Sequence, residues 1–207
     1  MALLRRRENR PARRGTPADL LVVGLGNPGK EYERSRHNVG AEVVKRLATA
    51  HGGALKAGKE RALVSEVRIA DQLVALAFPT TFMNLSGESV QAAMAFFKVP
   101  LSNVMVLHDE LDLPWRDVRL KIGGGAAGNN GIKSIIQHCG PDFLRIRIGI
   151  GKPARGSTES WVLGDFDAME SAELPDVLHV AALAAESVVK DGPAAAQNRF
   201  NARPTAK

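Results

Sequence analysis

The sequence predicts a single α/β domain with a twisted, mixed, mostly parallel central sheet flanked by helices. Three observations support this fold class. Short apolar runs alternate with segments of helical periodicity, which is typical of strands connected by helices. The 207 residues suffice for one hydrophobic core. We find no internal repeat and no interdomain linker, so we expect the domain to span residues 19–207.

The first half of the chain contains three expected strands and two expected helices. Residues 19–25 form a short apolar run that ends in glycine, which indicates a buried strand. Apolar side chains recur at helical spacing over residues 37–50 and again over 85–98. Two β-rich runs lie between these helices, at 62–68 and 72–78, and Pro79 ends the second.

The second half adds three more strands. Residues 103–107 form an apolar run, and we expect a buried strand there. Runs 118–122 and 144–150 alternate with period two, so each predicts a strand with one buried face and one basic face. A glycine-rich turn and a helix over about 130–138 lie between them. We expect a glycine-rich loop over about 151–158 and a last helix over 172–190, with a proline near its start, where proline is tolerated.

Composition narrows the possible function classes. The net charge is +6, and residues 1–19 carry six arginines against two acidic side chains. We interpret residues 1–18 as a disordered basic extension, and both a nucleic-acid-binding arm and a solvated segment of no specific use remain open. No apolar run approaches the roughly 18 residues of a membrane span, so we expect no membrane partner. Cys139 is the single cysteine, so no intrachain disulfide can form, which suits a cytoplasmic location.

Polar side chains follow the ends of the expected strands or begin the expected helices. In open α/β sheets, ligands bind beyond the carboxyl ends of the strands. We therefore expect six polar side chains near one rim of the sheet: Asn27, His37, Asn84, His108, Asp109 and Asn130.

The chemistry of these side chains favours hydrolysis. The chain has no GxSxG elbow, and Cys139 lies in an apolar helical stretch. A histidine paired with an aspartate, without a serine or cysteine nucleophile, suits general-base activation of water. Asparagine amides can donate to the oxygen that becomes negative when water attacks a carbonyl. The set therefore predicts hydrolysis of an activated acyl group with no covalent intermediate.

Three competing site interpretations are weaker. Gly24 begins a GxGxxG motif after a strand, but no helix opens inside it and no acidic residue ends a second strand about twenty residues on. The segment GNNGIKS resembles the end of a P-loop but lacks its contiguous Gly-Lys-Ser. The acidic cluster around His108 is accompanied by no HExxH motif and no cysteine pair. We therefore expect no cofactor and no metal.

Five sequence blocks together resemble one family. GLGNPGKEYERSRHNVG, FPTTFMNLSG, HDELDLP, GGG…GNNGIKSI and FLRIRIGIGKP occur in the order found in bacterial-type peptidyl-tRNA hydrolases, and the resemblance runs from about Leu20 to Arg199. It implies a monomeric, cofactor-free enzyme that hydrolyses the ester bond of peptidyl-tRNA and so recycles tRNA released by stalled ribosomes.

The resemblance implies catalytic roles for four residues. It makes His37 the general base that acts on water, and Asp109 the residue that orients it. Asn27 matches the residue that positions the substrate carbonyl or stabilises the oxyanion. Asn84, beside Met83, matches the residue that helps hold the water, the histidine or the peptide backbone.

The resemblance also implies contacts with tRNA. Asn130 matches an asparagine that contacts the substrate near the acceptor end, and Tyr32 a tyrosine near the tRNA-binding loop. Lys121 and Arg147 match a basic pair that clamps the 5′-phosphate, a charge-assisted site that the basic strand faces also favour. Arg145 would widen this patch. Ordinary solvated charge on a strand surface is the alternative interpretation.

Two departures from the family pattern keep a second hypothesis open. The glycine-rich loop reads GGGAAGNNG, where the family usually carries histidines as in GGHNG, and Ser35 replaces the more usual threonine. A catalytically weak or inactive RNA-binding relative of the same fold is therefore the alternative, although the intact His37 and Asp109 favour catalysis. Asn84 and Asn130 could also serve as helix N-caps.

Overall fold

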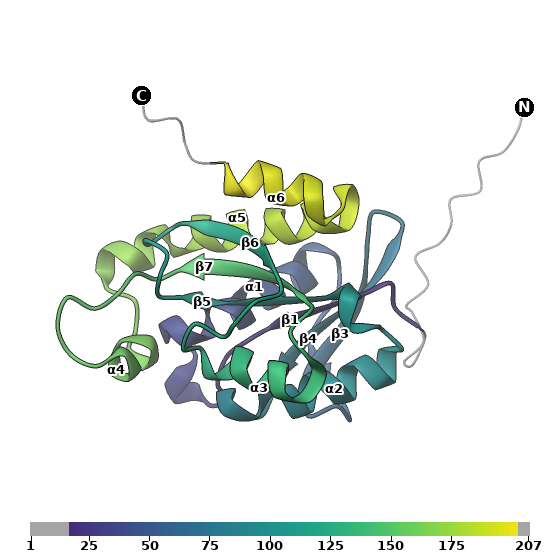
Figure 1. The fold of residues 1–207 in the computed structure, drawn as a ribbon, viewed down its shortest axis with the longest axis horizontal. Coiled ribbons are helices and arrows are strands. Elements are labelled where there is room, and N and C mark those ends of the chain that lie inside the picture. Colours follow the sequence, from purple (N-terminus) through teal and green to yellow (C-terminus); the bar gives the residue numbers. More distant parts are fainter. Residues whose placement is uncertain (1–16, 203–207) are drawn as a thin grey trace, which may run out of the picture.

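The computed structural model describes residues 17–202, so almost all of the expected extension at 1–18 lies outside the described residues. Within them the chain forms a seven-stranded sheet of order β2-β3-β4-β1-β5-β7-β6 (Figure 1). The strands are β1 (Leu20–Gly24), β2 (Lys56–Ala57), β3 (Ala62–Ile69), β4 (Gln72–Pro79), β5 (Val104–Glu110), β6 (Val118–Ile122) and β7 (Leu144–Gly149). The α-helices are α1 (Val39–Ala50), α2 (Ser86–Phe97), α3 (Asn130–Cys139), α4 (Thr158–Leu163), α5 (Ala168–Asp191) and α6 (Pro193–Asn201).

The sheet has a parallel centre and antiparallel edges. Strands β4, β1, β5 and β7 run parallel, whereas β2 and β3 at one edge and β6 at the other pair antiparallel with their neighbours. This confirms the predicted mixed α/β sheet. From β1 the chain runs through α1 to β2 and β3 at one edge, and from β4 it crosses through α2 to β5 on the other side of β1. The connections therefore change direction at β1, and such a switch point is where open sheets bind ligands.

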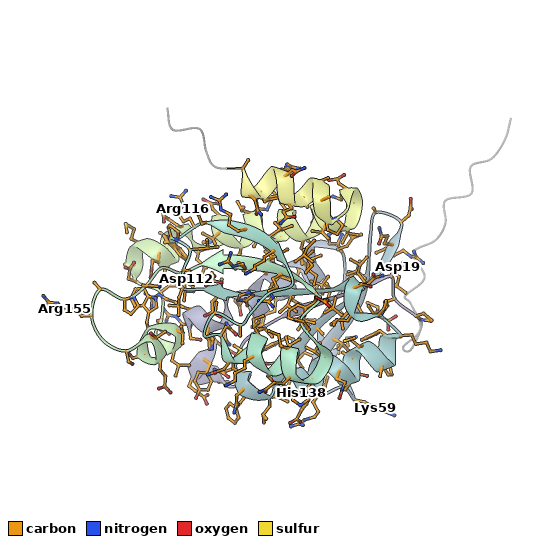
Figure 2. All side chains as sticks on the ribbon, viewed as in Figure 1. Asp19, Lys59, Asp112, Arg116, His138 and Arg155 are labelled. Carbon is orange, nitrogen blue, oxygen red and sulfur yellow. The ribbon has the colours of Figure 1, made fainter. Side chains whose placement is uncertain are left out.

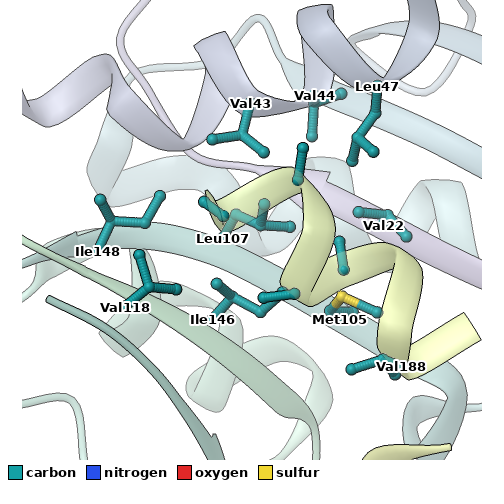
Figure 3. Close-up of a cluster of buried hydrophobic side chains, with 14 of the residues drawn as sticks. Val22, Val43, Val44, Leu47, Met105, Leu107, Val118, Ile146, Ile148 and Val188 are labelled. Carbon is teal, nitrogen blue, oxygen red and sulfur yellow. The ribbon is translucent and has the colours of Figure 1, made fainter. Parts of the chain in front are cut away.

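The two faces of the sheet are covered by different helices. Helices α1 and α5 pack on one face, and α2 and α3 on the other (Figure 1). On the α1 face, Val43 and Val44 pack with Val22 and Leu107 of the central strands (Figure 3). Because β1 and β5 are covered on both sides, β1 and the first four residues of β5 read as continuous apolar runs without alternation.

The first turn of α1 touches the sheet backbone directly. A Cβ atom added to Gly40 would lie 2.1 Å from the Leu107 carbonyl oxygen, so only glycine permits this approach. The Ala41 amide donates to the Leu25 carbonyl at 3.0 Å. This contact places the segment before α1 at the carboxyl ends of β1 and β5.

Two predicted boundaries differ by more than two residues, and the short elements β2, α4 and α6 were not predicted. Strand β5 continues to Glu110, three residues past the predicted end, because its polar residues still pair with β7. Helix α4 begins at Thr158, at the end of the predicted loop. Helix α5 begins at Ala168, where Asp167 forms a capping box with Glu170, so Pro175 lies inside the helix and not near its start.

Candidate active site

A cavity of about 540 Å³ opens at the carboxyl edge of the parallel strands. Its walls come from the loop after β1, the turn before α1, the segment before α2, the end of β5, the start of α3, and α4. Five of the six polar side chains predicted for this rim line it, together with Met83: Asn27, His37, Asn84, Asp109 and Asn130.

The sixth, His108, was placed wrongly by the sequence. It lies inside β5, where alternation points it to the opposite sheet face from Asp109, and its side chain is 2% exposed. Its Nδ1 donates to the Asp109 carbonyl at 2.7 Å. Burial lowers the pKa of His108, and the Arg145 guanidinium acts in the same direction against the neighbouring carboxylates.

His37 and Asp109 form a buried pair at the cavity wall. His37 lies in the 3-10 turn η2 (Arg36–Asn38), and its Nδ1 is 2.8 Å from Asp109 Oδ1. The two residues are 7% and 3% exposed. Because Nδ1 donates to the carboxylate, Nε2 is the nitrogen left to accept a proton. The arrangement is therefore that of an oriented general base.

Two opposing effects act on the His37 imidazole. Burial by itself lowers the pKa of His37, but the charge of Asp109 and its hydrogen bond together outweigh burial. The pKa of His37 consequently lies above its ordinary value.

The amide of Asn27 has a fixed orientation. Its Oδ1 accepts the Met83 backbone N–H at 2.8 Å. Asn38, which the sequence analysis did not single out, holds the Asn27 backbone: it accepts from the Asn27 N–H at 2.8 Å and donates to the Asn27 carbonyl at 2.9 Å. None of the hydrogen bonds within residues 17–202 uses the Asn27 Nδ2 group. That group is available to an acceptor in the cavity.

The start of α3 differs from the expectation for Asn130. Asn130 is the first helical residue, but the N-cap is Asn129, whose Oδ1 accepts from the Gly131 and Ile132 amides. The Asn129 Nδ2 group donates to Asp109 Oδ1 at 3.0 Å. Asn84 lies in the 3-10 turn η3 (Met83–Leu85) and caps no helix either. The preference of asparagine for N-caps is the signal that could have identified Asn129.

Helix α4, which was not predicted from the sequence, forms one wall of the cavity. The glycine-rich segment before it projects from the domain, with Arg155 far out on the loop (Figure 2). Arg36, next to His37, contacts α4 and the segment after it. Its guanidinium lies 3.8 Å from the Trp161 ring centroid and donates to the Asp165 carbonyl at 2.6 Å. It also pairs with Glu170 at 2.5 Å.

The predicted phosphate pair lies outside the cavity lining, as does Tyr32 in the 3-10 turn η1 (Lys30–Tyr32). Lys121 is exposed near the end of β6, and no carboxylate of residues 17–202 pairs with it. Arg147 Nε lies 2.8 Å from Glu110 Oε2. The expectation that Arg145 adds to a solvated patch is wrong: it is 3% exposed, and its guanidinium donates to carbonyls of the 123–128 loop.

The described residues carry neither a metal-like cluster nor a spanning helix. No three or more His, Cys, Asp or Glu side chains of residues 17–202 gather as metal ligands would. Over the same residues, every helix is too short or too polar to cross a bilayer.

Comparison with known proteins identifies the family. A family model described as peptidyl-tRNA hydrolase matches residues 21–207. The chain belongs to the peptidyl-tRNA hydrolase family. A peptidyl-tRNA hydrolase of Sorangium cellulosum is 50% identical over 189 residues, covering 89% of this chain and 85% of that one. One of Streptomyces avermitilis is 48% identical over 191 residues, covering 89% and 94%.

Solved structures agree with this assignment. The crystal structure of the peptidyl-tRNA hydrolase from Acinetobacter baumannii superposes with a TM-score of 0.83 at 37% identity, covering 94% of this chain and 99% of that one. The resemblance inferred from the five sequence blocks is thereby confirmed, and so is the fold of this peptidyl-tRNA hydrolase family member.

Proposed function

We propose that the chain hydrolyses the ester bond between the peptide and the terminal ribose of peptidyl-tRNA, with water activated by His37. The 2.8 Å contact between His37 Nδ1 and Asp109 Oδ1, at the wall of a cavity of about 540 Å³, carries this proposal. An imidazole held by a buried carboxylate can take a proton from water without a covalent intermediate. Family membership supports the choice of substrate.

The reaction follows from the positions of these groups. Water gives its proton to His37 Nε2 while its oxygen attacks the ester carbonyl. The carbonyl oxygen becomes negative, and the free Asn27 Nδ2 group is the donor proposed to stabilise it. Collapse of the intermediate breaks the bond to the ribose oxygen, which takes the proton back from His37. The products are free peptide acid and tRNA.

Other cavity residues are assigned to binding. Asn84, beside the buried Met83, contributes a polar group to the cavity wall, and we assign it to the water or the peptide backbone. Asn130 lines the cavity at the start of α3, and we assign it to the substrate near the tRNA acceptor end.

The residues proposed to contact tRNA lie outside the cavity lining. Lys121 is an exposed cation that no carboxylate of the described residues pairs with, and Arg147 shares its charge with Glu110. We assign both to the 5′-phosphate of the acceptor stem, with Lys121 contributing more because Arg147 is partly neutralised. Tyr32 is proposed to contact the same tRNA. We further propose that the domain beginning near residue 19 acts as a monomer in the cytoplasm, where translation takes place.

Deacylation of an N-acetyl-aminoacyl-tRNA tests the proposal. We expect turnover that falls by about 10²–10⁴-fold in His37→Ala, the usual contribution of a general base. His179→Ala is the matched control, because His179 is exposed on α5, and it should keep wild-type turnover. A chelator should have no effect. Wild-type turnover in His37→Ala would refute the mechanism.

The altered glycine-rich loop favours one alternative, an RNA-binding protein of the same fold without hydrolysis. Tight tRNA binding with no deacylation by the wild-type chain would support it. The contact between Asn129 of this loop and Asp109 argues instead for a loop that serves the general base.

A further inference from the structure

We propose that Asn129 is a positioning residue that holds the Asp109 carboxylate toward His37 and thereby limits how strongly His37 retains a proton. The inference rests on the proposed role of His37 as general base. It concerns the part of the glycine-rich loop in which this chain departs from its family's sequence pattern.

Asp109 Oδ1 receives two donors from different parts of the chain. His37 Nδ1 approaches from the turn before α1 at 2.8 Å, and Asn129 Nδ2 from the loop before α3 at 3.0 Å. Asp109 is 3% exposed, so water does little to orient it. Two donors to one oxygen restrict rotation of the carboxylate, and the imidazole is held through it.

The amide of Asn129 cannot simply turn away from Asp109. Its Oδ1 accepts the Gly131 amide at 3.0 Å and the Ile132 amide at 3.1 Å, so it caps α3. Engaging the oxygen in this way directs the NH₂ group at the carboxylate. The position requires a side chain that accepts and donates at once. Aspartate and serine can cap a helix equally well, but neither supplies an NH₂ donor.

The Asn129 amide also has an electrostatic effect. The Asn129 donor partly compensates the negative charge on Asp109 Oδ1. The carboxylate therefore attracts the protonated His37 imidazole less strongly than it would with His37 as its single donor. Other charged groups near the pair are Glu110 and Glu159, which line the cavity. Arg36 is engaged by Glu170, and His108 lies on the other sheet face. Without the Asn129 donor, we expect Asp109 to hold the proton on His37 more firmly, which leaves less free base at neutral pH.

Two capping substitutions separate this role from a structural one. Asn129→Ser keeps an N-cap and removes the donor, and Asn129→Asp keeps an N-cap and replaces the donor with a negative charge. NMR titration of the His37 imidazole in the full chain, assigned with His37→Gln, reports its midpoint without substrate. We expect the midpoint to rise in Asn129→Ser and to rise further in Asn129→Asp. Asn129→Ser keeps the cap and should melt close to wild type. Asn129→Ala, which lacks the cap, and Asn129→Asp, which sets a second carboxylate against the buried Asp109, should both melt lower.

Kinetics supply the second measurement. The acid limb of the pH profile of kcat/KM should move to higher pH in both capping variants, because the free base is the active form. At neutral pH we expect kcat to fall roughly tenfold in Asn129→Ser, with KM nearly unchanged. The size is taken from metalloproteins, where loss of the hydrogen-bond partner that orients a metal-bound histidine has a comparable effect.

The two measurements distinguish failure of this inference from failure of the proposed function. If the titration midpoints shift as expected and the wild-type chain does not deacylate tRNA, the proposed function is wrong and the positioning role stands. An unchanged His37 midpoint in both capping variants would overturn the inference. So would a loss of activity that follows the melting temperature alone.

Discussion

Replacement of Arg36 by methionine should destabilise the domain strongly and open the cavity wall formed by α4. Arg36 and Glu170 are separated by 134 residues and meet at 2.5 Å, with side chains only 6% and 8% exposed. The Arg36 guanidinium also stacks on Trp161 and donates to the Asp165 carbonyl. Methionine fills much of the same volume but leaves the Glu170 carboxylate buried without its cation.

The expected magnitude follows from these contacts. Removing one partner of a buried ion pair costs about 3–5 kcal/mol, chiefly because the other charge is left uncompensated. Glu170 keeps one hydrogen bond, from the Asp167 amide at 2.9 Å, so we expect the lower part of this range, about 3 kcal/mol. For a chain of this size, that corresponds to a fall in melting temperature of about 6–12 °C.

Urea unfolding provides the measurement. Trp161 lies under Arg36, and Trp115 packs on Phe166, so tryptophan fluorescence reports this region while circular dichroism reports the whole fold. Glu170→Gln should cost less than Arg36→Met, because the amide oxygen can still accept from Asp167 and from Arg36. The double variant should be more stable than the sum of the two single losses predicts, since no buried charge remains unpaired.

Two results would refute the reasoning on Arg36. A loss below about 1 kcal/mol in Arg36→Met would place the pair among surface-like ion pairs despite its burial. Strict additivity in the double variant would show that the two side chains do not interact energetically.

Four further predictions follow from the same structure. Because the pKa of His37 is raised in the folded chain, its stabilising contribution is complete below the unfolded pKa, about 6.5, and is lost as pH rises through the folded pKa. In Asp109→Asn, burial lowers the pKa of His37 with no carboxylate to oppose it, so the contribution of His37 to the free energy of unfolding should reverse sign. Urea midpoints of both proteins across about pH 5–9 measure this, and matching pH profiles would contradict it. Lys121→Ala should weaken tRNA binding and reduce by about one the slope of the logarithm of the binding constant against the logarithm of salt concentration. Filter binding at several salt concentrations measures this slope, and an unchanged slope would contradict the proposed contact of Lys121 with the 5′-phosphate. Gly40→Ala should destabilise the fold by more than about 2 kcal/mol, because its Cβ would overlap a strand carbonyl, whereas Gly125→Ala meets open space and should melt near wild type. A chain that begins at residue 19 should deacylate tRNA as fast as the full chain, and a large loss would show that the basic extension takes part.

Local sequence patterns predicted most of the fold. Strands were identified correctly from the apolar runs at β1 and β4 and from the alternating runs at β6 and β7. Successive side chains of a strand point to opposite sheet faces, so their polarity indicates whether one face or both faces are buried. The same logic misplaced the end of β5. The polar residues at the end of β5 resemble the start of a loop in composition, although they still pair with β7.

Rim residues were predictable for a similar reason. The carboxyl ends of parallel strands meet at one edge, so Asn27, Asn84 and Asp109 were expected together without knowledge of the packing. His108 failed this test because one step along a strand reverses the side-chain direction. Its neighbour Asp109 reaches the cavity, whereas His108 is buried on the opposite face.

By itself, the sequence determined the family, most of the element types and most of the side chains near the site. Only the tertiary structure decided which of them touch: His37 meets Asp109 across 72 residues, Asn129 reaches the same carboxylate from a third segment, and Arg145 is buried under a loop. Periodicity describes the surroundings of one element at a time. Contacts between elements depend on how the helices dock on the sheet, here through the backbone approach at Gly40, and no local pattern encodes that geometry.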